Sequence, residues 1–198
     1  MPKLVDHSEQ CSQIALAACQ AMARRGVDTT MVEIARQAGV TTGMITHYFR
    51  SKREIVAAAL RLIFERTEAR LSIPAPDAED PLFHILKETL PLDEERQAES
   101  AVWVSFWGKV TTDQDLVNVN STLHQDAEEL YARLIRTAWK ESSSWHPTVF
   151  NQVCSSVLGF LNGLTASAVT SPGSWTKQRQ LNSLKLQLEL VRNWANQQ

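Results

Sequence analysis

The chain has 198 residues, of which 43% are hydrophobic and 21% charged, so it is expected to fold into one or two domains and not to be intrinsically disordered. The net charge of −2 hides an asymmetry, because residues 1–53 contain seven basic and four acidic residues and the remainder contains 13 basic and 18 acidic ones. A weakly basic N-terminal segment on an acidic body indicates a polyanionic partner at one end only.

The first 50 residues show the helical spacing of apolar residues, and no strand with alternating polarity is found anywhere in the chain. A first helix is predicted over residues 8–25, with Gly26 as its C-terminal stop. A second helix begins at Thr30, because Thr30 and Glu33 have the spacing of a capping box, and ends at Gly39. A third short helix covers about residues 42–49.

The rest of the chain is predicted to be helical too. A second capping box, formed by Ser51 and Glu54, opens a helix that continues to about residue 71, and the proline-rich residues 74–76 then break the chain. Asp80 and Pro81 begin the next helix. That helix ends at Pro91, and the remaining predicted helices are one that carries an aromatic cluster near residues 102–110 and three over about 113–138, 148–169 and 174–196. The expected fold class is therefore all-α with about nine helices.

The pattern of residues 30–55 is typical of a helix-turn-helix. Ile34, Ala35 and Ala38 provide an inner face for the second helix, and Gly39 supplies the left-handed conformation of a sharp turn. In the third helix Ile45 and Phe49 lie four residues apart and are expected to point into the core. The side chains left facing outward are short or planar hydrogen-bonding groups, as a helix that reads the DNA major groove needs: Thr42, Thr46, His47 and Tyr48.

This segment resembles the TetR family of bacterial repressors over about fifty residues. The family pattern is Thr, three residues, Ile-Ala, two residues, Ala-Gly-Val-Ser, one residue, Gly, then an aromatic cluster ending in Phe, two residues and Lys. The matching positions are Thr30, Ile34, Ala35, Ala38, Gly39, Val40, Gly43, His47, Tyr48, Phe49 and Lys52. One position departs, because Thr46 stands where the family usually has Tyr. Residues 42–49, 90–96 and 103–107 are also similar to the choline-responsive BetI branch.

The resemblance implies a DNA-binding domain over residues 1–53 and a domain for ligand sensing and dimerisation over residues 54–198. We expect Gly43 both to allow close helix packing and to leave space for DNA, and Lys52 to contact a phosphate. The residues expected to contact DNA are Thr30, Thr41, Thr42, Gly43, Thr46, His47, Tyr48 and Lys52. Thr30 and Ser51 also cap helices, whatever else they do.

Two further groups of residues stand out in the body. Trp103, Phe106 and Trp107 have helical spacing, which is typical of a core and equally of the wall of a ligand cavity; we expect at least one of them to line a pocket. The last two helices have a second apolar or small-residue face each, more than a monomer can bury, and this favours a two-fold dimer built as a four-helix bundle. The residues expected at that interface are Ser155, Gly159, Gly163, Leu186, Leu190 and Trp194.

The three cysteines, at positions 11, 19 and 154, have neither disulfide nor zinc spacing, so we expect a cytoplasmic protein without a metal or cofactor. The first ten residues lack the apolar run of a signal peptide, and the uncharged segment 142–176 is interrupted by Asn, Gln and Pro, which favours an interface helix over a membrane span. No nucleophile–base pair, metal cluster or phosphate loop is found, so an enzyme is not expected. The favoured interpretation is a homodimeric repressor that binds double-stranded operator DNA and releases it when a small organic effector binds the body; the alternative is a helical protein-interaction module without DNA binding.

Overall fold

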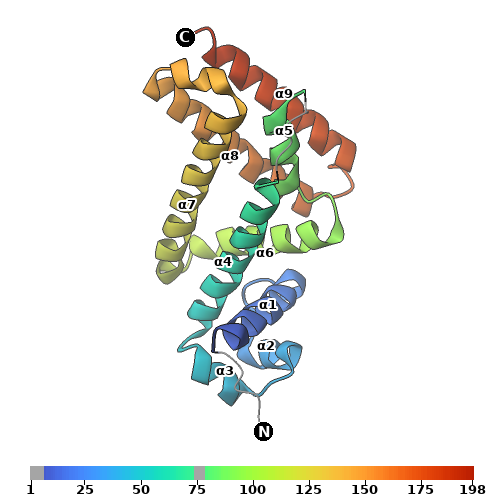
Figure 1. Ribbon diagram of the computed structural model, residues 1–198. Coiled ribbons are helices and arrows are strands. Elements are labelled where there is room, and N and C mark those ends of the chain that lie inside the picture. Colours follow the sequence, from blue (N-terminus) through green and yellow to red (C-terminus); the bar gives the residue numbers. More distant parts are fainter. Residues whose placement is uncertain (1–6, 74–78) are drawn as a thin grey trace. The chain divides into compact units, whose positions relative to one another are not determined.

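The computed structural model describes residues 7–73 and 79–198, and in these residues all regular structure is helical (Figure 1). The α-helices are α1 (His7–Arg25), α2 (Met31–Ala38), α3 (Thr42–Tyr48), α4 (Lys52–Leu71), α5 (Pro81–Leu86), α6 (Glu94–Val110), α7 (Gln114–Ala138), α8 (Pro147–Thr170) and α9 (Lys177–Ala195). Two short 3₁₀ helices, η1 (Lys87–Thr89) and η2 (Lys140–Ser144), follow α5 and α7. The all-α prediction is confirmed, whereas the break predicted at residues 74–76 lies outside the described residues.

The helix ends follow local signals in the sequence. Gly26 and Gly39, at φ +75° and +68°, terminate α1 and α2 in the left-handed conformation that glycine adopts without strain. Asp80 caps α5 through hydrogen bonds from the backbone N–H groups of Leu82 and Phe83. The segment between the predicted helices over 113–138 and 148–169 contains η2, in which the backbone N–H of Ser142 donates to the carbonyl oxygen of Trp139.

The chain divides into two compact units. The first contains Met1–Arg66 and Ala98–Asn120, and the second contains Thr67–Gln97 and Ser121–Gln198, so the boundaries fall inside α4, α6 and α7. These units are defined by packing, and the functional division at residue 53 stays a prediction.

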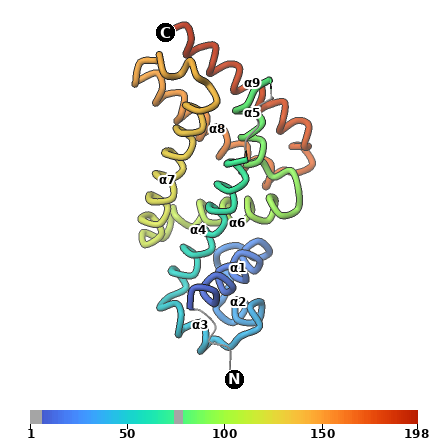
Figure 2. The backbone as a smooth tube through the Cα atoms, in the orientation of Figure 1, coloured from blue at the N-terminus to red at the C-terminus, as the bar shows by residue number. Residues whose placement is uncertain are grey.

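In the first unit, α1, α2 and α3 pack together, as the smooth tube of Figure 2 shows at the N-terminal end of the chain. Apolar residues of α1, α2, α3, α4 and α6 form its core. The fully buried ones are Ile14, Ala18, Ile34, Ile45, Ile55, Ala59, Leu60, Val102 and Phe106. Ile45 and Phe49 of the third helix are 0% and 7% exposed, which confirms that this pair points inward.

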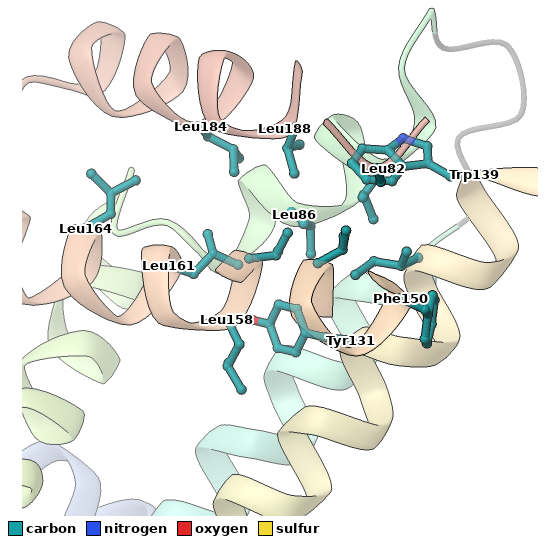
Figure 3. Close-up of a cluster of buried hydrophobic side chains, with 14 of the residues drawn as sticks. Leu82, Leu86, Tyr131, Trp139, Phe150, Leu158, Leu161, Leu164, Leu184 and Leu188 are labelled. Carbon is teal, nitrogen blue, oxygen red and sulfur yellow. The ribbon is translucent and has the colours of Figure 1, made fainter. Parts of the chain in front are cut away.

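In the second unit, α5, α7, α8 and α9 enclose a continuous apolar core (Figure 3). Leu184 and Leu188 of α9 point toward α8, and Tyr131 of α7 lies beside Leu158 of α8. Burial raises the pKa of Tyr131 to about 12. Helix α8 is long and apolar enough to cross a membrane by length and composition, yet only 33% of that stretch is buried within the chain. The rest of this stretch is at least partly exposed in the single chain, so it is available for contact with another protein surface.

Candidate functional site

Helix α2 begins with the predicted capping box. The Thr30 hydroxyl accepts from the backbone N–H of Glu33, and the Glu33 carboxylate accepts from both the backbone N–H (2.9 Å) and the hydroxyl (3.0 Å) of Thr30. These hydrogen bonds from Thr30, with the nearby charges of Arg25 and Arg36, lower the pKa of the Glu33 carboxyl group. Arg25 also forms an ion pair with Glu33. Both donors of Thr30 are thus already engaged within the chain.

The turn between α2 and α3 is held by backbone hydrogen bonds. The N–H groups of Gly39 and Val40 donate to the carbonyl oxygens of Arg36 and Ala35, at 3.3 and 3.0 Å. Thr41 then caps α3, because its hydroxyl oxygen accepts from the N–H of Met44 at 3.1 Å. An accepting hydroxyl retains its own proton, so Thr41 can still donate to a partner outside the chain.

The outward face of α3 carries the predicted readers. Thr42, Gly43, Thr46 and His47 are exposed. The Thr46 hydroxyl donates to the carbonyl oxygen of Gly43 at 3.0 Å, which leaves its oxygen lone pairs to accept from a partner. Four of the residues predicted to contact DNA therefore lie on one exposed surface of α3.

Tyr48 is half-buried at the edge of this face. Its ring lies 4.9 Å from that of His7 and 5.1 Å from that of His47, measured between ring centroids, and the contact with His47 is edge-on. Both distances are within the range of aromatic ring contacts.

The prediction that Gly43 permits close helix packing is wrong for this chain. A Cβ atom built at Gly43 would meet only the Thr41 hydroxyl oxygen, at 3.8 Å, which is an ordinary van der Waals distance. Positive φ angles are found at Gly26 and Gly39 and not at Gly43. Neither the packing of the described residues nor the backbone conformation therefore requires a glycine here.

Lys52 is the first residue of α4 and is half-buried. The Ser51 hydroxyl accepts from the N–H of Glu54 at 3.2 Å, as predicted, but the Glu54 carboxylate accepts from the N–H of Arg50 at 2.7 Å and not from that of Ser51. The second capping box is therefore confirmed in its hydroxyl half only. Arg53 forms an ion pair with Asp115 at the start of α7.

A link between the α1–α2 loop and α6 was not predicted. The backbone N–H of Val27 donates to the Ser105 hydroxyl at 2.9 Å, and Lys109 lies 3.1 Å from the Asp28 carboxylate. A Cβ atom at Gly26 would lie 2.6 Å from the same Ser105 hydroxyl, so the loop approaches α6 closely. Val27 and Ser105 are 78 residues apart, and no local sequence signal could indicate their contact.

The aromatic trio of α6 belongs to the first unit, together with α1–α3. Phe106 is fully buried, whereas Trp103 and Trp107 are half-buried. The ring centroid of Trp103 lies 6.1 Å from that of Phe106 and 6.1 Å from that of Trp107, and the two indole planes are inclined by 34°. The pair of indoles thus offers partly open apolar surface, while Phe106 contributes to the core.

The residues predicted for the dimer interface are all exposed in the single chain. Ser155, Gly159 and Gly163 lie on α8, and a Cβ atom at either glycine would meet nothing within 4 Å. On α9, Leu186 and Leu190 are each 57% exposed and Trp194 is 41% exposed. Helices α8 and α9 pack against each other within the second unit, as Figures 1 and 2 show.

No group of three or more His, Cys, Asp and Glu side chains that could hold a metal ion is found among residues 7–73 and 79–198. The three cysteines are free thiols. Burial raises the pKa of Cys19 to about 12 and that of Cys154 to about 11, so neither is an activated nucleophile.

Two protein families match parts of the chain. Residues 14–59 match "Bacterial regulatory proteins, tetR family", and residues 78–191, more than half of the chain, match "BetI-type transcriptional repressor, C-terminal". The HTH-type transcriptional regulator PksA of Bacillus subtilis (strain 168) is 31% identical over 124 residues, which are 61% of this chain and 60% of that protein. The BetI regulator of Escherichia coli (strain K12 / DH10B) is 33% identical over 113 residues, 54% of this chain and 58% of that protein. The matches thus span less than two thirds of these curated relatives.

Solved structures of transcriptional regulators share the fold. A regulator from Rhodococcus sp. Rha1 superposes with a TM-score of 0.80 at 23% identity, covering 93% of this chain and 97% of that one. A regulator from Saccharomonospora viridis, determined in complex with choline, superposes with a TM-score of 0.74 at 23% identity, covering 92% and 96%. The matched families and relatives are transcriptional regulators and not enzymes.

Proposed function

The chain belongs to the TetR family of transcriptional regulators, and from this premise we propose that it is a cytoplasmic homodimeric repressor that binds operator DNA and releases it when a small organic effector binds the C-terminal domain. The observation that carries the DNA-binding part is the exposed polar face of α3, held in place by the buried pair Ile45 and Phe49 and by the Thr41 cap. A helix anchored on one side and polar on the other suits insertion into the major groove.

Within this surface the predicted residues divide into two roles. Thr42, Thr46 and His47 read base edges, and the hydrogen bond from Thr46 to its own helix leaves it as an acceptor, which suits the amino group of adenine or cytosine. Thr41, Tyr48 and Lys52 contact the sugar–phosphate backbone, Thr41 through its remaining hydroxyl proton.

Thr30 acts less directly than the resemblance implies. Because Glu33 engages both of its donors, Thr30 contributes by capping α2, whose positive N-terminal end then lies near a phosphate. Gly43 contributes by leaving room for the DNA, since the nearest described atom to a Cβ built there is the Thr41 hydroxyl oxygen, at 3.8 Å.

The homodimer is proposed to form through the exposed faces of α8 and α9. Leu186, Leu190 and Trp194 follow one another at four-residue spacing on α9, and the open space beside Gly159 and Gly163 suits close approach of a second helix. A two-fold axis through this face buries the apolar residues of α9 and the small residues of α8 against the same residues of the second subunit. When the dimer binds DNA, its two α3 helices lie in successive major grooves, about 34–36 Å apart.

The effector is proposed to contact Trp103 and Trp107, with Phe106 supporting them from the core. A quaternary ammonium compound such as choline is a candidate, because the C-terminal domain matches the BetI type and a structural neighbour was solved with choline. Indole faces attract such cations, by about 0.5–2 kcal/mol per ring.

The link between α6 and the α1–α2 loop supports a route by which the effector acts on the DNA-binding helices. Ser105 lies between the two tryptophans in the sequence of α6 and accepts from the Val27 N–H. The Asp28–Lys109 pair is more exposed and contributes less, at most about 1 kcal/mol. A shift of α6 around a bound effector therefore pulls on the loop between α1 and α2, favouring a state with lower affinity for DNA.

The proposal is tested by fluorescence anisotropy with the upstream region of the protein's own gene and with a scrambled duplex of equal length, at several salt concentrations. We expect tighter binding to the upstream region and a strong dependence of both affinities on salt. Equal affinity for the two duplexes at every salt concentration would contradict specific operator binding. Choline and its neutral isostere 3,3-dimethylbutan-1-ol are then titrated while tryptophan fluorescence and DNA release are followed; a cation-selective site responds to choline alone.

A further inference from the structure

Recognition helix α3 presents one large aliphatic side chain to solvent. Met44 is 36% exposed, whereas Ile45, the other large aliphatic residue of the helix, is fully buried. A single exposed methionine is ordinary on a protein surface. This one lies on the exposed side of α3, next to His47, which follows it by three residues.

The place of Met44 on this face follows from helix geometry. Successive residues are rotated by about 100° around the helix axis, and Ile45 points inward. Gly43 and His47 therefore lie near the outermost line of the helix, Thr46 lies on one flank, and Met44 lies on the other. The N–H of Met44 donates to both the hydroxyl and the carbonyl oxygen of Thr41, each at 3.1 Å, so its backbone is fixed.

We propose that Met44 is a specificity-determining residue that packs against the C5 methyl group of a thymine in each half-site of the operator; this inference rests on the proposed function. Thymine methyl is the one apolar group that base edges present in the major groove. A methionine that covered a base amino or carbonyl group would instead leave that group without a hydrogen bond, which is unfavourable. The thymine contacted by Met44 lies beside the base contacted by His47, on the side away from Thr46.

The experiment removes the methyl group and nothing else. The purified full-length chain selects its preferred duplex from a randomised pool, and each thymine of that duplex is then replaced singly by deoxyuridine. For the wild-type chain we expect one thymine in each half-site whose replacement weakens binding by about fourfold, the value of one buried methyl group. The other replacements are expected to have little effect unless another side chain contacts that methyl.

Three variants identify the side chain responsible. Met44→Gln has similar length but a polar end, and it is expected to bind the thymine and uracil duplexes equally at that position. Met44→Leu is expected to retain the preference, and so is Val32→Ala, which shortens an exposed apolar residue of α2. Thermal unfolding of each variant checks that the fold is intact.

The outcomes are distinct. Loss of the uracil effect in Met44→Gln, with retention in the other two variants, supports the contact. An identical uracil pattern in wild type and Met44→Gln, or no uracil effect at any thymine in the wild type, overturns it while leaving operator binding intact. A selection that enriches no sequence at all overturns the proposed function itself.

Discussion

Gly43→Ala is expected to stabilise the chain and at the same time weaken its binding to DNA. The added methyl group would meet only the Thr41 hydroxyl oxygen, at 3.8 Å, and the φ angle at Gly43 is not positive. Alanine in place of glycine in a helix is worth about 0.5–1 kcal/mol of folding free energy, partly through the unfolded chain. For a chain of this size that gain raises Tm by about 1–4 °C.

The same methyl group lies near the outermost line of α3, where the bases are proposed to approach. Inserting one group into a closely packed contact costs about 1–3 kcal/mol, which is about 5- to 150-fold in affinity for each half-site. Thermal unfolding and fluorescence anisotropy with the operator duplex measure the two effects separately on the same preparation.

Gly108→Ala is the matched control. Gly108 is an exposed glycine inside α6, and a Cβ atom there would meet none of the described atoms within 4 Å. It is expected to raise Tm by a similar amount and to leave DNA affinity unchanged. If Gly43→Ala lowers Tm, the fold does need the glycine; if it binds the operator as tightly as wild type, DNA does not come close to this position. Either result would refute the reasoning.

Four other predictions concern the remaining parts of the proposal. Lys52→Ala is expected to weaken binding to operator and random DNA alike and to reduce the slope of log affinity against log salt by about 1 for each subunit; an unchanged slope excludes a phosphate contact. Gly163→Glu is expected to give a folded monomer in sedimentation experiments, because its side chain has open space in the single chain but would bury a charge in the dimer, whereas Gly108→Glu should remain dimeric. Ser105→Ala leaves the buried N–H of Val27 without its partner, so unfolding should become easier by about 1–3 kcal/mol, and the same effector concentration should release less DNA; full release would argue against this route. Trp103→Ala should weaken the fluorescence response to the effector, and an unaltered response places the pocket elsewhere.

The sequence alone was sufficient for the helices and for the helix-turn-helix, because the signals for both are local. Thr30 caps α2 with Glu33, three residues away, and Gly39 ends it in the conformation that the turn needs. The two faces of α9 were also readable, since residues four apart share one side of a helix. Leu186 and Leu190, which share the second face, are exposed, whereas Leu184 and Leu188, which share the opposite face, are buried within the chain.

Local spacing did not determine which partner a polar group would choose. The Glu54 carboxylate accepts from Arg50 and not from Ser51, although the spacing of Ser51 and Glu54 is that of a capping box. Both N–H groups lie within reach of a flexible carboxylate, and the path of the chain entering α4 decides between them.

Only the tertiary structure placed Trp103 and Trp107 in the same packing unit as α1–α3 and joined Ser105 of α6 to Val27. It also showed that no other part of the described chain fills the space beside Gly43. Contacts between residues 78 positions apart, and the empty space left beside a residue, depend on how whole helices pack against one another. Helical periodicity tells which side of a helix is buried, but not which distant segment covers it.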